Sequence, residues 1–519
     1  METKTEISQE SRKGFLTLLG MCLVAAFVIL TICSKSSFFY RINNWGDASC
    51  YFNEGRGILN GLVPFRDLAE QKGPVIFFVY ALGELFFPES FIGIFIIEII
   101  CSAIFLYFSV KTVGLFTDTK ELKILIPFVL AAAVYGAYIF RHGGGPEEMS
   151  LSIFAYLLYL GTRYQVAGEL PSKGQMVSLG ICAGMIFWTK YTLCAMFIAV
   201  LLIMMVCAFS RSMVKEFFMD ILFFILGCIL ISIPVLGYFA ANGALKDLFI
   251  NYFYNNIFLY RANDGLYKGF GSNMKLAVTL LLKARNVLAL LLIAAGMLWM
   301  LFTRRYALLL GTVLSFGFTF VIINSGICQK YGNLPLFVYC AYGFCPIAGL
   351  LNSKKFRIHA VVNVLVAVIS AIIAFVLCIH TVDMKRSREY FPQYVFADEM
   401  NNSGIENYSY LYYGTLDEGY YYGADYLPRW RAYVQLNQGG SELKDLQDGY
   451  VNNREPDFIV TERLLCDSSD KENITKSLPE VLKKTVVEFE NFGYEQIDEM
   501  TYYYEEYDHL VRLYRRIDR

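Results

Sequence analysis

The sequence predicts a mainly α-helical, polytopic membrane protein with a C-terminal extracytoplasmic α/β domain. Of its 519 residues, 56% are hydrophobic and only 18% are charged, a composition too apolar for one soluble core. Residues 381–519 differ from the rest, because they carry 16 Lys and Arg against 27 Asp and Glu. We therefore expect about eleven transmembrane helices within residues 1–380 and a water-soluble domain over residues 381–519.

The first apolar run is predicted to be a retained transmembrane helix. Gly14–Cys33 follows Arg12 and Lys13 and is not followed by a small-residue cleavage site, which predicts a cytoplasmic N-terminus rather than a removed signal peptide. Further apolar runs of spanning length lie at Ser90–Phe116, Ile124–Phe140, Met149–Tyr164, Met176–Trp188, Tyr191–Ser210, Phe218–Ala240, Val287–Phe302, Ala307–Asn324, Pro335–Leu351 and Ile358–Ile379.

Basic residues between these runs predict their orientation. When the runs alternate from a cytoplasmic start, the positive-inside rule is satisfied and an odd number of spans places the C-terminal domain outside. Pro74–Phe87 is apolar but short, and counting it as a span would invert every later loop, so we predict that it lies along the outer interface. The basic residues placed inside are Lys120, Lys123, Arg163, Lys173, Arg211, Lys215, Arg304, Arg305, Lys354, Lys355 and Arg357.

Several classes of function find no support in the sequence. It has no Ser-His-Asp arrangement, P-loop, GxGxxG or zinc-ligand spacing, and a tail with a net charge of −11 argues against nucleic acid as a partner. Most of the 13 cysteines lie in apolar runs and none forms a CxxC pair. A disulfide among Cys50, Cys328 and Cys466, which lie outside the predicted spans, stays open.

The predicted outer face collects the polar chemistry, and its first loop begins with Asp47. A carboxylate near the membrane surface can act as a general base, although Asp47 also suits a helix N-cap. The segment Gly61–Asp67, which contains Arg66, is typical of a turn. Lys72 then precedes the interfacial helix, where it could meet a lipid phosphate or simply snorkel.

A second predicted outer loop places two carboxylates behind three glycines. Glu147 and Glu148 follow Gly143–Gly145, and glycines allow a close approach of the backbone to another group, whereas simple pairing of acids with the helix dipole is the plain alternative. Lys190 lies between two apolar runs, where a cation costs free energy unless it snorkels or finds an anion. Lys330, followed by Tyr331, is a second lysine next to an apolar run, although this indication is weaker. His142 alone does not indicate a metal site.

The tail is predicted to be a small α/β domain. Aromatic runs at Tyr408–Tyr413, Asp457–Val460 and Leu510–Tyr514 are typical of strands, and helices are expected to begin near Ser441 and Ser477. The tyrosines suit either stacking against a sugar or packing between strands.

The order of these features resembles the GT-C glycosyltransferases, the superfamily of protein O-mannosyltransferases and bacterial aminoarabinose transferases. The resemblance consists of an early Asp (Asp47), G-x-x-P-[FY]-x-D at Gly61–Asp67, K-G-P at Lys72–Pro74, G-G-x-x-E-E at Gly143–Glu148, and Lys190 at the outer mouth of two helices. It covers about the first 200 residues well and the remaining spans only by topology.

The resemblance implies an inverting transfer of a sugar from a polyprenyl-phosphate carrier to an extracytoplasmic acceptor, which would be a cell-envelope glycan, lipid or protein. It implies that Asp47 is the general base, that Glu147 or Glu148 orients a substrate, and that Lys72, Lys190 and Arg66 hold the donor phosphate. Asp67, Lys330 and Tyr331 are further candidates for substrate contacts. No metal or other cofactor is predicted, although relatives differ in their dependence on a divalent ion.

A polytopic transporter or lipid flippase is the main alternative, because many spans with a few buried charges also describe those proteins. Transporters tend to show repeated halves with a site at the bilayer midplane. Here the candidate residues belong to loops on one predicted side, which favours a transferase.

Overall fold

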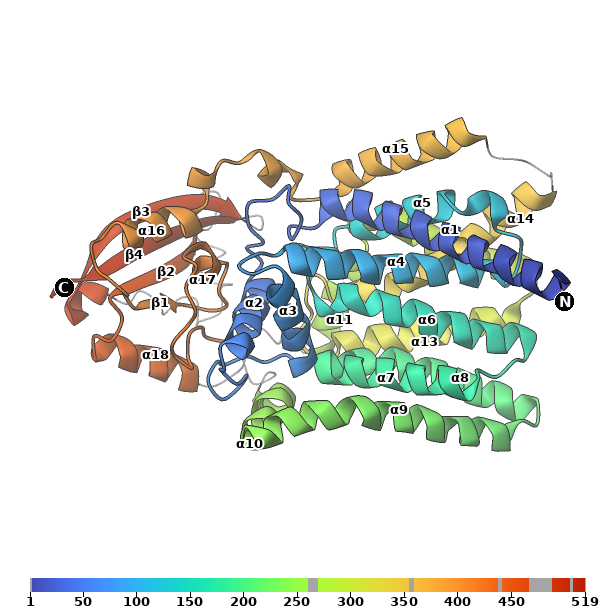
Figure 1. Cartoon of the computed structure of the whole chain (residues 1–519), viewed down its shortest axis with the longest axis horizontal. Coiled ribbons are helices and arrows are strands. Elements are labelled where there is room, and N and C mark those ends of the chain that lie inside the picture. The colour runs from blue at the N-terminus through green and yellow to red at the C-terminus, as the bar shows by residue number, and fades with distance from the viewer. Residues whose placement is uncertain are drawn as a thin grey trace. The chain divides into compact units, whose positions relative to one another are not determined.

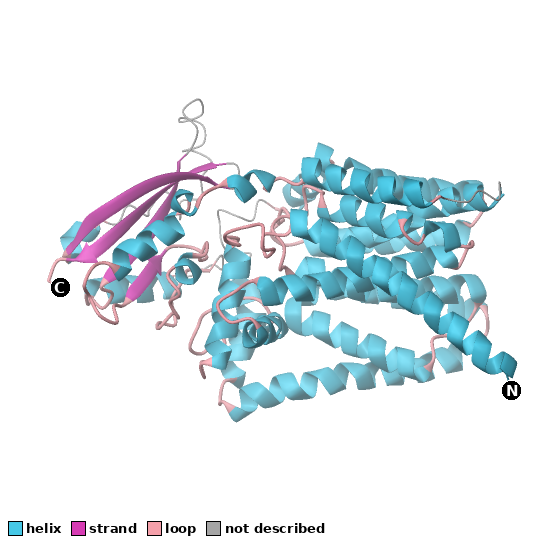
Figure 2. Cartoon of the chain, turned by 45° about the horizontal axis from the view of Figure 1, so that its top comes forward, coloured by secondary structure: helices cyan, strands magenta, loops and turns pink. Residues whose placement is uncertain are grey.

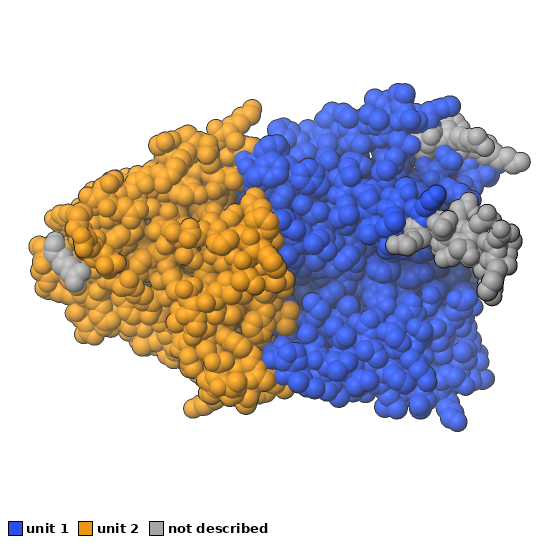
Figure 3. All heavy atoms as spheres, in the orientation of Figure 1, with its two compact units in different colours: residues 1–39, 94–235, 270–382 blue, residues 40–93, 236–269, 383–519 orange. Residues whose placement is uncertain are grey.

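A computed structural model of the chain describes residues 2–259, 269–353, 359–436, 441–465, 488–504 and 507–518. They form two compact units, coloured separately in Figure 3. Unit 1 comprises Met1–Phe39, Ile94–Val235 and Phe270–Val382, and unit 2 comprises Tyr40–Gly93, Leu236–Gly269 and Asp383–Arg519. The predicted inner-loop residues Lys354, Lys355 and Arg357, Cys466, and the helix expected near Ser477 lie outside the described residues.

Unit 1 is helical, and Figures 1 and 2 show its long helices. They are α1 (Glu2–Cys33), α4 (Ile92–Gly114), α5 (Leu125–Tyr135), α6 (Pro146–Ala167), α7 (Lys173–Lys190), α8 (Ala195–Ser210), α9 (Val214–Ala241, which ends in unit 2), α11 (Phe270–Leu281), α12 (Val287–Phe302), α13 (Tyr306–Asn324), α14 (Cys345–Ser353) and α15 (Ala360–Leu377). Short 3-10 segments are η1 (Lys120–Leu122), η2 (Tyr191–Cys194), η5 (Ala284–Asn286) and η6 (Leu334–Phe344).

Each predicted apolar run coincides with helical structure, and the prediction of a mainly α-helical, multi-pass membrane protein is confirmed. Among the described residues, eight helical segments are long and apolar enough to cross a membrane. Two predicted spans fall short of these criteria, because α5 has only 11 residues and α6 carries polar side chains. The count of eleven therefore stays a prediction.

One of the eight segments, Lys173–Ser210, consists of two helices that fold back on each other at Lys190. The backbone of Lys190 is extended, and Cys194 Sγ lies 4.0 Å from the carbonyl oxygen of Ala183. In a continuous helix these two residues would be about 16 Å apart. The predicted break between the runs ending at Trp188 and starting at Tyr191 is thus a reversal of the chain.

The helices of unit 1 pack through buried apolar residues and approach closely at glycines. α1, α5 and α15 contact one another, and α7 meets α9 at Gly180 and Gly227, where a Cβ on either glycine would collide with the opposite backbone. Small residues at such crossings are typical of membrane helices. Only 11% of the apolar window is buried in α9 and in α15, so most of their apolar side chains are available to lipid.

Unit 2 combines helices with a sheet. Its helices are α2 (Gly46–Leu59), α3 (Pro74–Phe86), α10 (Leu245–Leu248), the π-helical η3 (Phe249–Leu259), α16 (Pro392–Asn401), α17 (Tyr420–Gly423) and α18 (Glu442–Asn452), with short segments η7 (Thr381–Lys385), η8 (Arg388–Tyr390) and η9 (Phe489–Phe492). Its strands are β1 (Tyr410–Tyr413), β2 (Phe458–Leu465), β3 (Tyr494–Tyr504) and β4 (Tyr507–Arg516). The sheet has the order β1-β2-β4-β3, with β1 parallel to β2 and the other pairs antiparallel.

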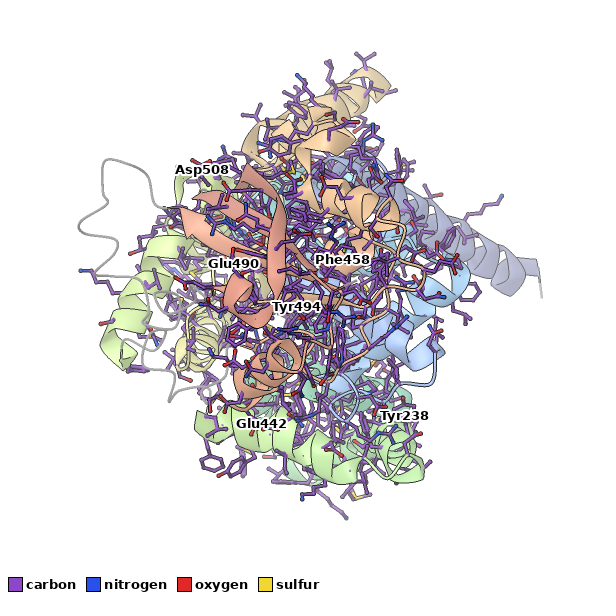
Figure 4. All side chains as sticks on the ribbon, turned by 90° about the vertical axis from the view of Figure 1, so that its left-hand side faces the viewer. Tyr238, Glu442, Phe458, Glu490, Tyr494 and Asp508 are labelled. Carbon is purple, nitrogen blue, oxygen red and sulfur yellow. The ribbon has the colours of Figure 1, made fainter. Side chains whose placement is uncertain are left out.

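The predicted α/β character of the tail is confirmed, with α18 beginning one residue after Ser441 and strands at all three predicted runs. β3 was not predicted, because its first half is rich in charged and amide side chains. Several tyrosines of the tail pack in its interior, since Tyr410, Tyr413, Tyr420, Tyr421 and Tyr433 are all buried. Phe458 and Tyr494, labelled in Figure 4, are likewise buried.

The loop that follows the first helix belongs to unit 2, where α2 packs against α3 at Gly55. A Cβ at this position would lie 2.7 Å from Ala81 N and 2.9 Å from Tyr80 Cβ, which is closer than real side-chain contacts. A glycine is therefore required where these helices touch.

We expect Gly55→Ala to lower the free energy of unfolding by about 1–3 kcal/mol, since overpacking forces the helices apart. The matched control is Gly449→Ala in α18, where a Cβ meets nothing within 4 Å and helix propensity alone should stabilise by up to about 1 kcal/mol. Thermal unfolding midpoints of the purified protein measure both effects. Equal upward shifts would contradict the close approach of α2 to α3.

Candidate functional site

The predicted site residues form two clusters, one in each compact unit. Unit 2 holds Asp47, Arg66, Asp67 and Lys72, and unit 1 holds Glu147, Glu148, Lys190, Lys330 and Tyr331. The candidate residues of the predicted outer loops therefore form two clusters and not one.

Asp47 and Lys72 form a buried ion pair in unit 2. Lys72 Nζ lies 3.4 Å from Asp47 Oδ2 and 3.5 Å from Oδ1, and Asp47 is only 5% exposed. Asp47 is in the first turn of α2, where the helix dipole favours an anion. The N-cap is Trp45, so the expectation that Asp47 itself caps the helix is wrong. The carboxylate is held at the helix start by a cation that also lies 5.8 Å from the ring centre of Tyr51.

Arg66 and Asp67 stabilise a turn beside this pair. Arg66 donates from Nε and Nη2 to the two Asp67 oxygens at 2.8 and 2.7 Å and from Nη1 to the carbonyl of Asn242 at 2.8 Å. This bidentate contact lowers the pKa of Asp67. The predicted turn is confirmed by the left-handed backbone of Gly61 and Phe65. Arg66 makes contacts that hold the turn, while its role toward a donor phosphate stays a prediction.

Sequence reasoning missed two buried carboxyl groups close to this cluster, Glu54 and Glu70. Both are 1% exposed, and burial, together with the charge of Glu70 and Asp67, raises the pKa of Glu54 well above its usual range. Burial also raises the pKa of Glu70, against the opposing effect of Lys72. The available signal was periodicity, because Glu54 lies two helical turns after Asp47 on α2.

Asp417 joins the tail of the chain to α2 within unit 2. Its Oδ2 accepts a hydrogen bond from Asn53 Nδ2 at 3.0 Å, and its Oδ1 accepts one from the backbone N–H of Tyr420 at 2.7 Å. Burial raises the pKa of Asp417 to about 7 despite these hydrogen bonds. Asp417 therefore fixes the helix that carries Asp47, although Asp417 follows Asn53 by 364 positions in the sequence.

In unit 1, Glu147 and Lys190 form a buried ion pair at the start of α6 and the end of α7. Glu147 is 2% exposed, and Lys190 Nζ also lies 5.5 Å from the ring centre of Tyr331. Glu147 is thus the anion that neutralises Lys190. The loop carrying Tyr331 meets the same cation, as expected for segments of one face.

Glu148 has a different environment from its neighbour. It accepts a hydrogen bond from the backbone N–H of Gly144 at 2.9 Å and lies close enough to Glu98 of α4 for the two carboxyl groups to interact. Ser34 Oγ donates to Glu98 at 2.7 Å. Gly143 has a left-handed backbone, and a Cβ there would collide with Ser34 and Glu98. Glu98 was not predicted, although an acid inside an apolar run was a visible signal.

The two histidines near this cluster stack, with ring centres 5.6 Å apart in His142 and His380. Burial, followed by the charges of Lys35, Arg141 and Lys330, lowers the pKa of His142 well below its usual range. His142 is therefore neutral at pH 7.

Two of the three cysteines outside the predicted spans, Cys50 and Cys328, are free thiols.

Comparisons with known proteins support the fold. No protein-family model and no curated protein sequence matches the chain. It is similar to the crystal structure of ArnT from Cupriavidus metallidurans bound to undecaprenyl phosphate, with a TM-score of 0.59 at 10% identity over 96% of this chain and 97% of ArnT. The apo state of ArnT gives a TM-score of 0.55 at 11% identity over 97% and 98%. The expected GT-C-like fold is confirmed.

We expect Lys190→Met to destabilise the protein by about 3–5 kcal/mol, because the variant leaves the Glu147 carboxylate buried without its cation. Adding Glu147→Gln to this variant should restore much of the loss. Unfolding midpoints of the two single variants and the double variant measure the coupling. A double variant as unstable as Lys190→Met would contradict the ion pair.

Asp417 predicts a pH dependence of stability. The pKa of Asp417 is raised from 3.8 to about 7 in the folded protein, so its contribution to the free energy of unfolding is fully present below about pH 4. This contribution is lost as the pH rises to about 7, by about 1.4 kcal/mol for each pH unit. Unfolding midpoints between pH 4.5 and 7.5 should decline less in Asp417→Asn than in the wild type. Parallel profiles would show that Asp417 does not titrate in this window.

Proposed function

We propose that this protein is a membrane glycosyltransferase that transfers a sugar from a polyprenyl-phosphate donor to an extracytoplasmic acceptor. The observation that carries the proposal is the fold, which matches ArnT over nearly the full length of both chains. The crystal structure of ArnT contains undecaprenyl phosphate, a lipid of the proposed donor class. The buried acid–lysine pairs at helix ends supply side chains suited to the reaction.

In the proposed reaction, an acceptor hydroxyl attacks the anomeric carbon of the donor sugar with inversion. Asp47 takes the proton of that hydroxyl as general base. The bond between the anomeric carbon and the phosphate oxygen breaks, and polyprenyl phosphate leaves. The Asp47–Lys72 pair supports this role because it places a carboxylate for the acceptor proton next to an ammonium group that can meet a phosphate, with 3.4 Å between Lys72 Nζ and Asp47 Oδ2.

The cations are proposed to bind the donor phosphate and to stabilise it as it leaves. Lys72 and Lys190 each present an ammonium group beside a carboxylate, and an ammonium has three donors that can serve a phosphate as well. Arg66 is the weaker candidate, since each of its side-chain nitrogens already donates a hydrogen bond, two of them to Asp67 and one to the carbonyl of Asn242.

Substrate orientation is proposed for Glu147 rather than Glu148, because Glu147 faces the cation Lys190 while Glu148 pairs with Glu98. Asp67, Lys330 and Tyr331 are proposed as further substrate contacts. We also propose that residues 1–380 form the transferase domain, that the N-terminus is cytoplasmic, and that residues 381–519 are extracytoplasmic.

A transporter or lipid flippase is the second proposal, since the fold alone does not fix the chemistry. The acid–lysine pairs lie at the ends of α2, α6 and α7 and in the connecting loops. Transporter sites are typically formed near the middle of broken spans. This placement favours the transferase.

We expect Asp47→Asn to reduce sugar transfer by about 10²–10⁴-fold, because the amide cannot accept the acceptor's proton. The purified protein is incubated with a panel of polyprenyl-phosphate sugars and membrane lipid extract, and release of polyprenyl phosphate is measured. Asp398→Asn is the matched control, since this half-exposed carboxylate of unit 2 pairs with Arg388 of the same C-terminal segment.

Two outcomes would count against the proposal. Full transfer by a correctly inserted Asp47→Asn variant would remove Asp47 from catalysis. Wild-type protein that releases no polyprenyl phosphate with any donor, but moves a lipid across vesicles, would favour the transporter.

A further inference from the structure

Three side chains of unit 2 converge away from the proposed reaction residues. Glu418, Glu462 and His509 place one ligand atom each within 4.8 Å of one another. Glu418 precedes α17, Glu462 lies in β2 and His509 in β4. In the antiparallel register His509 opposes Leu464, two residues from Glu462, so His509 and Glu462 point to the same face of the sheet.

The hydrogen bonds of His509 define what its Nδ1 atom presents to Glu462. Nε2 lies 3.1 Å from the carbonyl oxygen of Tyr504, and a carbonyl only accepts, so Nε2 carries the proton. In the neutral imidazole, Nδ1 then presents its lone pair to the Glu462 carboxylate, with which it is in contact. Nδ1 and the carboxylate are then both acceptors, so either a proton or a metal cation joins them.

His509 is the buried member of this cluster, and Glu418 and Glu462 are partly buried. His509 is 4% exposed, and its imidazole is the basic group in contact with Glu462. Tyr502 donates to Glu418 Oε2 at 2.9 Å, and Tyr412 donates to Glu462 Oε2 at 3.3 Å. A carbonyl that fixes the tautomer of a histidine and hydroxyls that orient carboxylates are the usual outer partners of metal ligands.

We propose that Glu418, Glu462 and His509 bind a divalent transition-metal ion such as Zn²⁺. One imidazole nitrogen and two carboxylate oxygens suit zinc, with water in the fourth position. The charge of the ion would balance that of the two carboxylates. This site is separate from the proposed sugar transfer and does not depend on it.

The consequence of binding would be structural. The ion would join the loop before α17 to strands β2 and β4, and the residue next to Glu418 is Asp417, which holds Asn53 of α2. Metal binding would therefore stabilise the loop against which α2 packs. Loss of the ion would lower the stability of unit 2.

The experiment uses the full chain, purified without a histidine tag and treated with EDTA. We expect the stripped protein to bind one equivalent of Zn²⁺ in calorimetry and to retain it through gel filtration, as measured by elemental analysis. Saturation should raise the unfolding midpoint by about 2–5 °C. His509→Gln, Glu462→Gln and Glu418→Gln should each weaken Zn²⁺ binding at least tenfold.

Glu499→Gln is the matched control, because this half-exposed carboxylate of β3 pairs with Arg512 on the same sheet and should bind Zn²⁺ as the wild type does. X-ray absorption of the zinc-loaded wild type should show one imidazole and oxygen ligands, which tests the site even where a variant fails to fold. The proposal is overturned if the stripped wild type binds no Zn²⁺, in which case a proton joins His509 to Glu462. It is equally overturned if all three variants keep the wild-type affinity.

Discussion

Burial of charge next to apolar helices is the constraint on which the arrangement of polar side chains depends. An ion removed from water is stable only when an opposite charge or several hydrogen bonds replace the lost hydration. Asp47 with Lys72, and Glu147 with Lys190, meet this requirement with partners from separate segments. Each pair therefore joins two parts of its unit and compensates the charge of both side chains.

Buried carboxyl groups that form no ion pair with a basic side chain among the described residues have a different environment. Within the part of the chain that the structure describes, neither buried oxygen of Glu54 has a hydrogen-bond partner, and burial raises the pKa of Glu54 well above its usual range. Glu148 shares its environment with Glu98 instead of a lysine. A neutral carboxyl can donate a hydrogen bond, whereas the paired carboxylate of Asp47 can accept a proton. The same residue type thus supplies different chemistry according to its partner.

The sequence predicted those features whose signals are local. Apolar runs revealed the helices because their length is set by the bilayer, and the reversal at Lys190 followed from a single polar interruption. The turn at Gly61–Asp67 was likewise visible in its residue types. Partners were not predictable: Glu98 and Asp417 reach their neighbours only through tertiary folding. β3 was missed because its charged residues pair across strands rather than alternate with apolar ones.

Unit 2 also changes how the C-terminal segment should be understood. A tail that only bound sugars would contact the rest of the chain sparingly, yet Asp417 bonds Asn53 and Asp425 pairs with Arg56, both on α2. The backbone N–H of Ala69, three residues before Lys72, donates to the carbonyl of Arg431 at 2.9 Å. Because these contacts involve both segments of the Asp47–Lys72 pair, the position of the proposed base depends on residues more than 350 positions later in the chain. The tail is thereby part of the framework of the candidate site.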